Sequence, residues 1–278
     1  MQQATFSVVI PICNGMEHLE MVVQDCLQLL PRVCTDHEII LVDAGSDDQT
    51  FLIAEHLAVA APTVMFIAHS NPIGVGQAVI SGIRAARGDY VLLTDATNQI
   101  NISEMLRLLP YIEHYPLVLG YRLNPQESWL LRRRQAFFRF LINRWCRLEL
   151  RDTGCRFSLY HTEALQSMAL QSTGPLILAE ICLYGRQHGH PHVQVGVQST
   201  AVRSRQQRRQ QAWLNRWSLW QTMRLYLRLA GPGPVRKMAP VTHAPMARPR
   251  TVLVLLAAGV FVVARGAQRL MRRKNSVV

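Results

Sequence analysis

Carboxylates and arginines are the side chains of this sequence that could do chemistry on a charged ligand. Asp43, in Val-Asp-Ala-Gly-Ser, and Asp95, in Thr-Asp-Ala-Thr, each follow a short run of aliphatic and β-branched residues. The formal net charge is +12, and arginine supplies almost all of it because only two of the 30 basic residues are lysines. Arginine binds phosphate oxygens in bidentate geometry, so the composition predicts a polyanionic ligand: a nucleotide diphosphate, a phospholipid headgroup, a lipid phosphate or a nucleic acid.

Strands and helices are expected to alternate over the first hundred residues, with both carboxylates at the ends of strands. Continuous apolar runs separated by helical stretches predict an α/β fold built on a parallel, doubly wound sheet. The expected strands are 7–12, 38–43, 64–68 and 90–94, and the expected helices are 17–30, 49–60 and 75–86. Ligands bind at the carboxyl ends of the strands in such sheets, so three loops are expected to form the functional edge: 11–14, 43–46 and 95–97.

Four segments together resemble a known enzyme family. They are Ser7-Val-Val-Ile-Pro-Ile-Cys-Asn14, Ile40-Leu-Val-Asp-Ala-Gly-Ser-Asp-Asp-Gln-Thr50, Gly74-Val-Gly-Gln-Ala78 with Gly82, and Ala86-Arg-Gly-Asp-Tyr-Val-Leu-Leu-Thr-Asp95. In this order and spacing they resemble the family-two glycosyltransferases of the GT-A fold, over roughly residues 5 to 205. Segments 118–122, 152–157 and 180–189 look most like the polyprenyl-phosphate sugar transferases of the dolichyl-phosphate mannosyltransferase type. The resemblance implies a Rossmann-like sheet with helices on both faces.

The resemblance also implies a donor site for a nucleotide diphosphate sugar at the sheet edge. In the family, the first loop and the acid that ends the second strand bind the base and the ribose. An Asp-x-Asp after the fourth strand holds Mg²⁺ or Mn²⁺ on the diphosphate, and Asp95 and Thr97 stand at those two positions here. The residues expected to bind the donor are therefore Pro11, Asn14, Asp43, Gly74 and Asp95.

Both acidic motifs depart from the family pattern at their second member. Ala44 stands where a base-binding carboxylate is expected, and Thr97 stands where the principal metal ligand is expected. Asp95 with the Thr97 hydroxyl could still hold Mg²⁺ or Mn²⁺ brought in by the donor, although more weakly. Three outcomes stay open: weak metal dependence, metal-free catalysis in which arginines replace the cation, or loss of catalysis. The arginines that could bind phosphate in this way, or serve as structural ion-pair partners, are Arg122, Arg156 and Arg203.

Two acids are candidates on the acceptor side. A sugar hydroxyl acceptor needs a general base, and Glu180 is the candidate for it, although it could equally pair with Arg186 on one helix. A lipid phosphate is already anionic and needs only cations to position it, so the arginine excess favours a lipid phosphate acceptor. Asp152 is expected either to orient Arg122 or Arg156 or to form an ordinary turn. The predicted catalytic residues are Asp95, Arg122, Asp152 and Glu180.

The sequence beyond residue 120 is basic and amphipathic. Residues 128–152 contain seven arginines among aromatic and aliphatic residues. A one-sided helix is predicted by the spacing of Phe137, Phe138, Leu141, Ile142 and Trp145. Such a helix either lies on an anionic membrane surface or packs on the core beneath a solvated basic face. A second stretch, 203–229, combines arginines with Trp and Tyr residues and favours the membrane.

Four consecutive parts are predicted along the chain. They are a GT-A domain over 1–205, a basic amphipathic helix over 206–230, a Pro-rich linker over 231–250, and a membrane helix with a basic tail over 251–278. The uncharged stretch 251–264 would span about 21 Å as a helix, against a hydrocarbon core of about 30 Å. A short membrane helix would therefore require bilayer thinning, and a hairpin or a surface anchor is the alternative.

The sequence predicts a membrane-associated glycosyltransferase that moves a hexose from a nucleotide diphosphate sugar to a polyprenyl phosphate or another lipid. The alternative is a pseudo-glycosyltransferase that binds nucleotide, lipid or a partner protein without transferring sugar. The six cysteines show no pairing or metal-ligand spacing, and the first residues lack the basic region of a signal peptide, so we expect a cytoplasmic catalytic part. Nucleic acid is not an expected partner, because the basic stretches are too aliphatic and contain no recognised binding motif.

Overall fold

A mixed β-sheet organises the part of the chain described by the computed structural model, which comprises residues 4–124, 129–146, 148–199 and 242–243. All of these residues belong to one unit that runs from Met1 to His243. The strands are β1 (Thr5–Ile12), β2 (Asp36–Asp43), β3 (Val64–Ala68), β4 (Tyr90–Leu93), β5 (Leu117–Arg122), β6 (Ser158–His161), β7 (His192–Val197) and β8 (Thr242–His243). Their order across the sheet is β3-β2-β1-β4-β6-β5-β7-β8.

The strand directions confirm the prediction for the first half of the sheet and correct it for the second. β1 pairs in parallel with β2 and β4, and β2 pairs in parallel with β3. The sheet is nevertheless not wholly parallel, because β6 runs antiparallel to both β4 and β5. The alternating pattern of the sequence ends near residue 95, before β6 begins, so it carried no information about this reversal.

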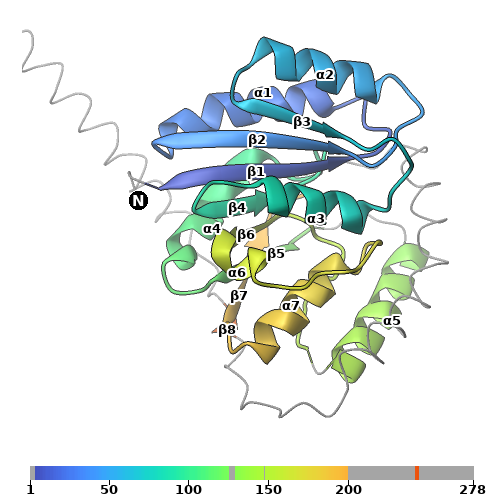
Figure 1. The fold of residues 1–278 in the computed structure, drawn as a ribbon. Coiled ribbons are helices and arrows are strands. Elements are labelled where there is room, and N and C mark those ends of the chain that lie inside the picture. Colours follow the sequence, from blue (N-terminus) through green and yellow to red (C-terminus); the bar gives the residue numbers. More distant parts are fainter. Residues whose placement is uncertain (1–3, 125–128, 147, 200–241, 244–278) are drawn as a thin grey trace, which may run out of the picture. The chain divides into compact units, whose positions relative to one another are not determined.

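Helices cover both faces of the sheet, as expected. They are α1 (Leu19–Leu29), α2 (Thr50–Ala60), α3 (Val75–Ala85), α4 (Met105–Ile112), α5 (Trp129–Cys146), α6 (Thr162–Gln166) and α7 (Ile177–Gln187), with short 3₁₀ turns at Leu30–Arg32 and Ile102–Glu104. Figure 1 shows α3 and α7 on one face and α1 and α4 on the other. Buried residues of α3, α5, α6 and α7 form one apolar core with alternate residues of the strands.

Close packing between α3 and the sheet brings the start of α3 to the functional edge. Gly82 faces β1, and a Cβ built at Gly82 would lie 2.3 Å from Cγ1 of Val9. Any larger residue would have to push α3 away from the sheet, so glycine is required for this packing. The N-terminus of α3, which begins after Gly74, is thereby held beside the carboxyl ends of β1 and β2.

The basic helix predicted within 128–152 is confirmed as α5, but its apolar side was assigned incorrectly. Ile142 and Cys146 face the core, whereas the side chains of Phe137 and Phe140 are 57% and 62% exposed. Phe137 and Ile142 are five positions apart, which separates their directions by about 140° on a helix of 3.6 residues per turn. The two residues therefore cannot lie on one face.

None of the helices in the described ranges is long and apolar enough to cross a membrane. The predicted amphipathic helix 206–230 and the predicted membrane helix and tail 251–278 lie outside those ranges. Of the predicted linker 231–250, only Thr242 and His243 are described, and they pair with β7.

Candidate functional site

The loops after β1 and β2 interlock at the carboxyl edge of the sheet. Ile12 pairs with Asp43, so both strands end at the same level. The buried carboxylate of Asp43 accepts hydrogen bonds from the amide of Ser46 at 3.1 Å and from its hydroxyl at 2.6 Å. Ser46 Oγ in turn accepts from the amide of Asn14, at 3.0 Å, and Asn14 Oδ1 accepts from the amide of Asp47, at 3.0 Å. Asp43 and Asn14 thus fix the shape of both loops.

The loop after β4 is fixed by Asp95. Oδ1 of Asp95 accepts from the amide of Thr97 at 3.0 Å and also from the Thr97 hydroxyl. Oδ2 accepts from Nη2 of Arg156 at 3.2 Å, across 61 positions of sequence. Asp95 therefore binds its own turn on one side and a guanidinium on the other. This ion pair joins the end of β4 to the segment that enters β6.

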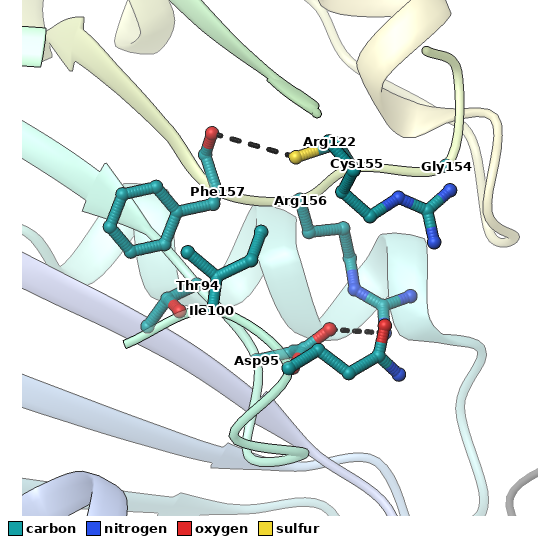
Figure 2. Close-up of a pocket in the computed structure, with 9 residues that line it drawn as sticks. Thr94, Asp95, Ile100, Arg122, Gly154, Cys155, Arg156 and Phe157 are labelled. Carbon is teal, nitrogen blue, oxygen red and sulfur yellow. Dashed lines mark hydrogen bonds and ion pairs between the residues drawn. The ribbon is translucent and has the colours of Figure 1, made fainter. Parts of the chain in front are cut away.

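A small pocket opens beside this ion pair (Figure 2). Its lining residues are Thr94, Asp95, Gln99, Ile100, Arg122, Gly154, Cys155, Arg156 and Phe157. The hollow is small: its empty space is about 250 Å³ even with the open solvent at its mouth included. The pocket is therefore suited to part of a ligand, such as a phosphate group.

A buried ion pair between Arg122 and Asp152 supports the pocket wall. Nε of Arg122 donates to one carboxylate oxygen at 2.7 Å and Nη2 donates to the other at 3.1 Å, so the pair is bidentate. Asp152 also accepts from the amide of Gly154 at 2.8 Å. Burial pushes the pKa of Asp152 upward, but the hydrogen bonds and the charge of Arg122 outweigh burial and hold the pKa below its usual value. Asp152 thus has both predicted roles: it orients Arg122 and it forms a turn.

Comparison with known protein families identifies the chain. Residues 7–168 match the family described as Glycosyl transferase family 2. The chain belongs to this family. This assignment confirms the resemblance found in the motifs that end β1, β2 and β4.

Curated relatives of the chain are named as transferases for undecaprenyl phosphate. The undecaprenyl-phosphate 4-deoxy-4-formamido-L-arabinose transferase of Serratia proteamaculans (strain 568) is 29% identical over 167 residues, covering 58% of this chain and 50% of the relative. The protein of the same name from Proteus mirabilis (strain HI4320) is 29% identical over 164 residues, again covering 58% and 50% of the two chains. The chain therefore spans about half the length of the curated relatives that it matches.

Solved structures support a GT-A-like fold for the chain. Glucosyl-3-phosphoglycerate synthase from Mycobacterium tuberculosis in complex with phosphoglyceric acid superposes with a TM-score of 0.61 at 20% identity, covering 86% of this chain and 88% of the synthase. The complex of that synthase with Mn²⁺ and UDP-glucose gives a TM-score of 0.57 at 20% identity, with the same coverage. At this identity the similarity establishes the fold alone.

Among the described residues, the side chains around Asp95 offer few ligands for a divalent cation. Mg²⁺ prefers oxygen ligands, commonly one or two carboxylates together with substrate phosphates. Here Asp95 supplies a single carboxylate, one oxygen of which accepts from Thr97 and the other from Arg156. Within the described ranges, no group of three or more acids, histidines or cysteines is arranged to hold a metal ion.

Glu180 does not point into this pocket but binds backbone. The carboxylate, which is 2% exposed, accepts from the amide of Gln171 at 3.0 Å and from the amide of Ser172 at 2.8 Å. The segment 171–174, fixed in this way, packs on the start of α3: a Cβ at Gly74 would lie 1.9 Å from the carbonyl oxygen of Thr173. Gly76 donates its amide to the same oxygen at 3.0 Å. Gly74 thus has a packing role beside its predicted donor-binding role.

The structure brings most of the predicted residues to one edge of the sheet. Pro11 is buried in β1, Asp43 is the last residue of β2, and Asn14 and Asp95 lie in the loops that follow β1 and β4. Arg203 lies outside the described ranges. Sequence reasoning missed Ser46, which links two loops, and Gln99, Gly154, Cys155 and Phe157, which line the pocket. The pattern Asp95-x-Thr97 could have indicated that Asp95 binds its own turn, and the pattern Asp152-x-Gly154 could have indicated the same for Asp152.

Proposed function

We propose that this protein transfers a hexose from a nucleotide diphosphate sugar to a polyprenyl phosphate or a related lipid at the membrane. The observation that supports this most directly is the pocket at the carboxyl edge of the sheet, in which Arg156 stands beside Asp95. Family membership supports the reaction class, and the relatives that act on undecaprenyl phosphate support the acceptor. A cytoplasmic catalytic part remains within this proposal as an expectation from the sequence.

The donor site that we propose consists of the interlocked loops and the pocket. The loops of Asn14 and Asp43 would bind the base and the ribose, since both are already held in shape at the edge where ligands bind. The diphosphate gains negative charge as the glycosidic bond breaks. A preorganised guanidinium directed at this developing charge lowers the barrier without reorganisation during the reaction.

The acceptor that we propose is a phosphate, which attacks without a general base. A phosphate monoester is anionic at neutral pH and can displace the nucleotide diphosphate directly once it is positioned. This choice agrees with the position of Glu180, whose carboxylate is bound to two backbone amides rather than directed at the pocket. A sugar hydroxyl acceptor would instead require a base close to the donor sugar.

A transfer assay tests this function. The purified protein in detergent, given radiolabelled UDP-glucose, GDP-mannose or UDP-GlcNAc with polyprenyl phosphate, should form a lipid-linked sugar with one donor, measured by chromatography with and without Mg²⁺ or Mn²⁺. Asp95→Ala should reduce transfer about tenfold or more, because Arg156 loses the partner that orients it. No product with any donor, together with unchanged nucleotide binding by Asp95→Ala, would favour the pseudo-glycosyltransferase.

For membrane association we propose an exposed face of α5, called here the basic aromatic face. It consists of Trp129, Arg133, Phe137, Phe140 and Arg144. Helical geometry places all five within an arc of about 80°, on the side away from Ile142. The guanidinium of Arg133 lies over the ring of Trp129, at 5.5 Å. Arginine beside exposed aromatic rings is the combination that binds the headgroup region of anionic membranes.

α5 is also joined to the loop that carries the pocket. Nδ2 of Asn143 donates to the carbonyl of Leu150 at 2.9 Å, and the amide of Leu150 donates back to Oδ1 at 3.0 Å. Nη1 of Arg139 donates to the carbonyl of Arg151 at 2.7 Å, immediately before Asp152. Membrane contact through α5 would therefore place the pocket close to the headgroups, where a lipid phosphate lies.

Deletion of residues 248–278 should weaken binding to vesicles that contain anionic lipid without abolishing it, because α5 remains. Sedimentation with vesicles measures this, and added salt should reduce the residual binding. Serine at Trp129, Phe137 and Phe140 should lower the binding of the full chain, whereas serine at Leu52 and Val59, exposed on α2, should not. Complete release of the deletion variant would contradict the role of α5.

A further inference from the structure

We propose that Arg156 takes the place of the divalent cation on the donor diphosphate, with Asp95 as its positioning residue. The proposal rests on the proposed function, since it concerns the same donor site. It assigns the charge that neutralises the diphosphate to a side chain of this chain instead of to Mg²⁺ or Mn²⁺.

The first observation is an unsatisfied donor in the pocket. Nε of Arg156 is buried and has no hydrogen-bond partner, whereas Nη2 donates to Asp95 at 3.2 Å. Buried polar groups without partners are rare in native proteins, and each one calls for an explanation. The Arg156 side chain is 24% exposed, so an anion that enters the pocket can reach its guanidinium. A phosphate oxygen would bind the exposed part of the guanidinium, and a small shift of the side chain on binding would let Nε reach an acceptor as well.

The second observation is the balance of charge at the end of β4. In the family pattern, two carboxylates of the Asp-x-Asp face one divalent cation, and the formal charges sum to zero. Here Thr97 removes one negative charge, and the single carboxylate of Asp95 faces the single positive charge of Arg156. Among the described residues, the loss of one negative charge at position 97 is thus accompanied by a guanidinium beside the remaining carboxylate.

The third observation is that the position of Arg156 is fixed from both ends. Asp152, four positions earlier, is held by the bidentate pair with Arg122 and by the turn to Gly154. Phe157, which follows Arg156, is 2% exposed, and its carbonyl accepts from the amide of Gly120 at 3.0 Å. A guanidinium on a backbone held in this way is preorganised to bind an anion. An arginine side chain on a free loop would not be preorganised. Figure 2 shows Arg156 reaching from this segment toward Asp95.

Calorimetric titration of the full chain in detergent tests the inference. The probes are UDP, GDP and CDP, with the matching monophosphates, each in EDTA and in Mn²⁺. At least one diphosphate should bind in EDTA with an affinity within about threefold of that in Mn²⁺. Arg156→Ala should weaken diphosphate binding at least tenfold in both conditions and change monophosphate binding little. Arg156→Lys should recover part of the loss, and circular dichroism should show that both variants are folded.

Two further variants complete the test. Arg107→Ala is the matched control, because it removes another arginine ion pair: Nε of Arg107 lies 3.0 Å from the carboxylate of Glu104, and the Arg107 side chain is 29% exposed. This variant should leave diphosphate binding unchanged. Thr97→Asp restores the second acid and should make diphosphate binding depend on Mn²⁺. The inference is overturned if EDTA abolishes diphosphate binding by the unmodified protein, if no diphosphate binds, or if Arg156→Ala binds normally. Diphosphate binding in EDTA without sugar transfer would instead overturn the proposed function alone.

Discussion

Replacing Asp152 by alanine is expected to lower the free energy of unfolding by about 3–5 kcal/mol. The variant would leave the guanidinium of Arg122, whose side chain is 4% exposed, without its bidentate partner in the protein interior. Loss of one member of a buried ion pair is costly because water replaces the lost partner poorly in the protein interior. Urea unfolding of the two proteins at neutral pH, followed by circular dichroism, measures the difference.

The pH dependence of this difference has a defined sign. Because Arg122 holds the pKa of Asp152 below its unfolded value, which is about 3.9, the stabilisation is fully present above pH 4. It is lost as the pH falls through the lower pKa of the folded state, so the stabilities of the native protein and Asp152→Ala should converge in acid. A double variant, Arg122→Met with Asp152→Leu, removes both charges and should recover most of the stability. A loss below about 1 kcal/mol in Asp152→Ala at pH 7 would contradict this account.

The first four strands were predictable because their sequence is locally consistent with one structure. Runs such as Val8 to Ile12 and Ile39 to Val42 are buried on both faces, so the apolar pattern is continuous and marks a parallel strand directly. β6 was not predicted because its sequence, Ser-Leu-Tyr-His, is not a continuous apolar run and its direction depends on pairing with β4 and β5. Such pairing is a property of the tertiary structure that no local pattern contains.

The candidate site was predictable in its location but not in its contacts. Asp43 and Asp95 were expected at the carboxyl edge because each ends a strand, and both are found there. The Arg156–Asp95 pair joins positions 61 residues apart, and it forms only because β6 lies beside β4. The helical face of α5 was predicted incorrectly for a related reason. Hydrophobicity alone does not show which apolar residues meet the core and which stay exposed.

Glu180 offers the other large expected effect, and it separates two chemical roles. If Glu180 fixes the segment 171–174, Glu180→Ala should lower the free energy of unfolding by about 1–3 kcal/mol, since the amides of Gln171 and Ser172 lose a charged acceptor. The freed segment would no longer pack closely on Gly74, so the KM for the donor should rise while kcat changes less. Urea unfolding and steady-state kinetics with the donor identified in the transfer assay measure both effects.

Glu180→Gln distinguishes positioning from general-base catalysis. A glutamine side chain keeps one carbonyl oxygen as an acceptor but presents an NH₂ donor to the amides that the carboxylate now binds, so the variant should be destabilised and should bind donor weakly. A general base replaced by glutamine would instead fold normally and lose about 10²- to 10⁴-fold in kcat at an unchanged KM. Glu163→Gln, at an exposed acid in the first turn of α6, is the matched control and should leave stability and kinetics unchanged. The carboxylate of Glu180 meets backbone amides and not the pocket, so a change in stability and KM is the expected result.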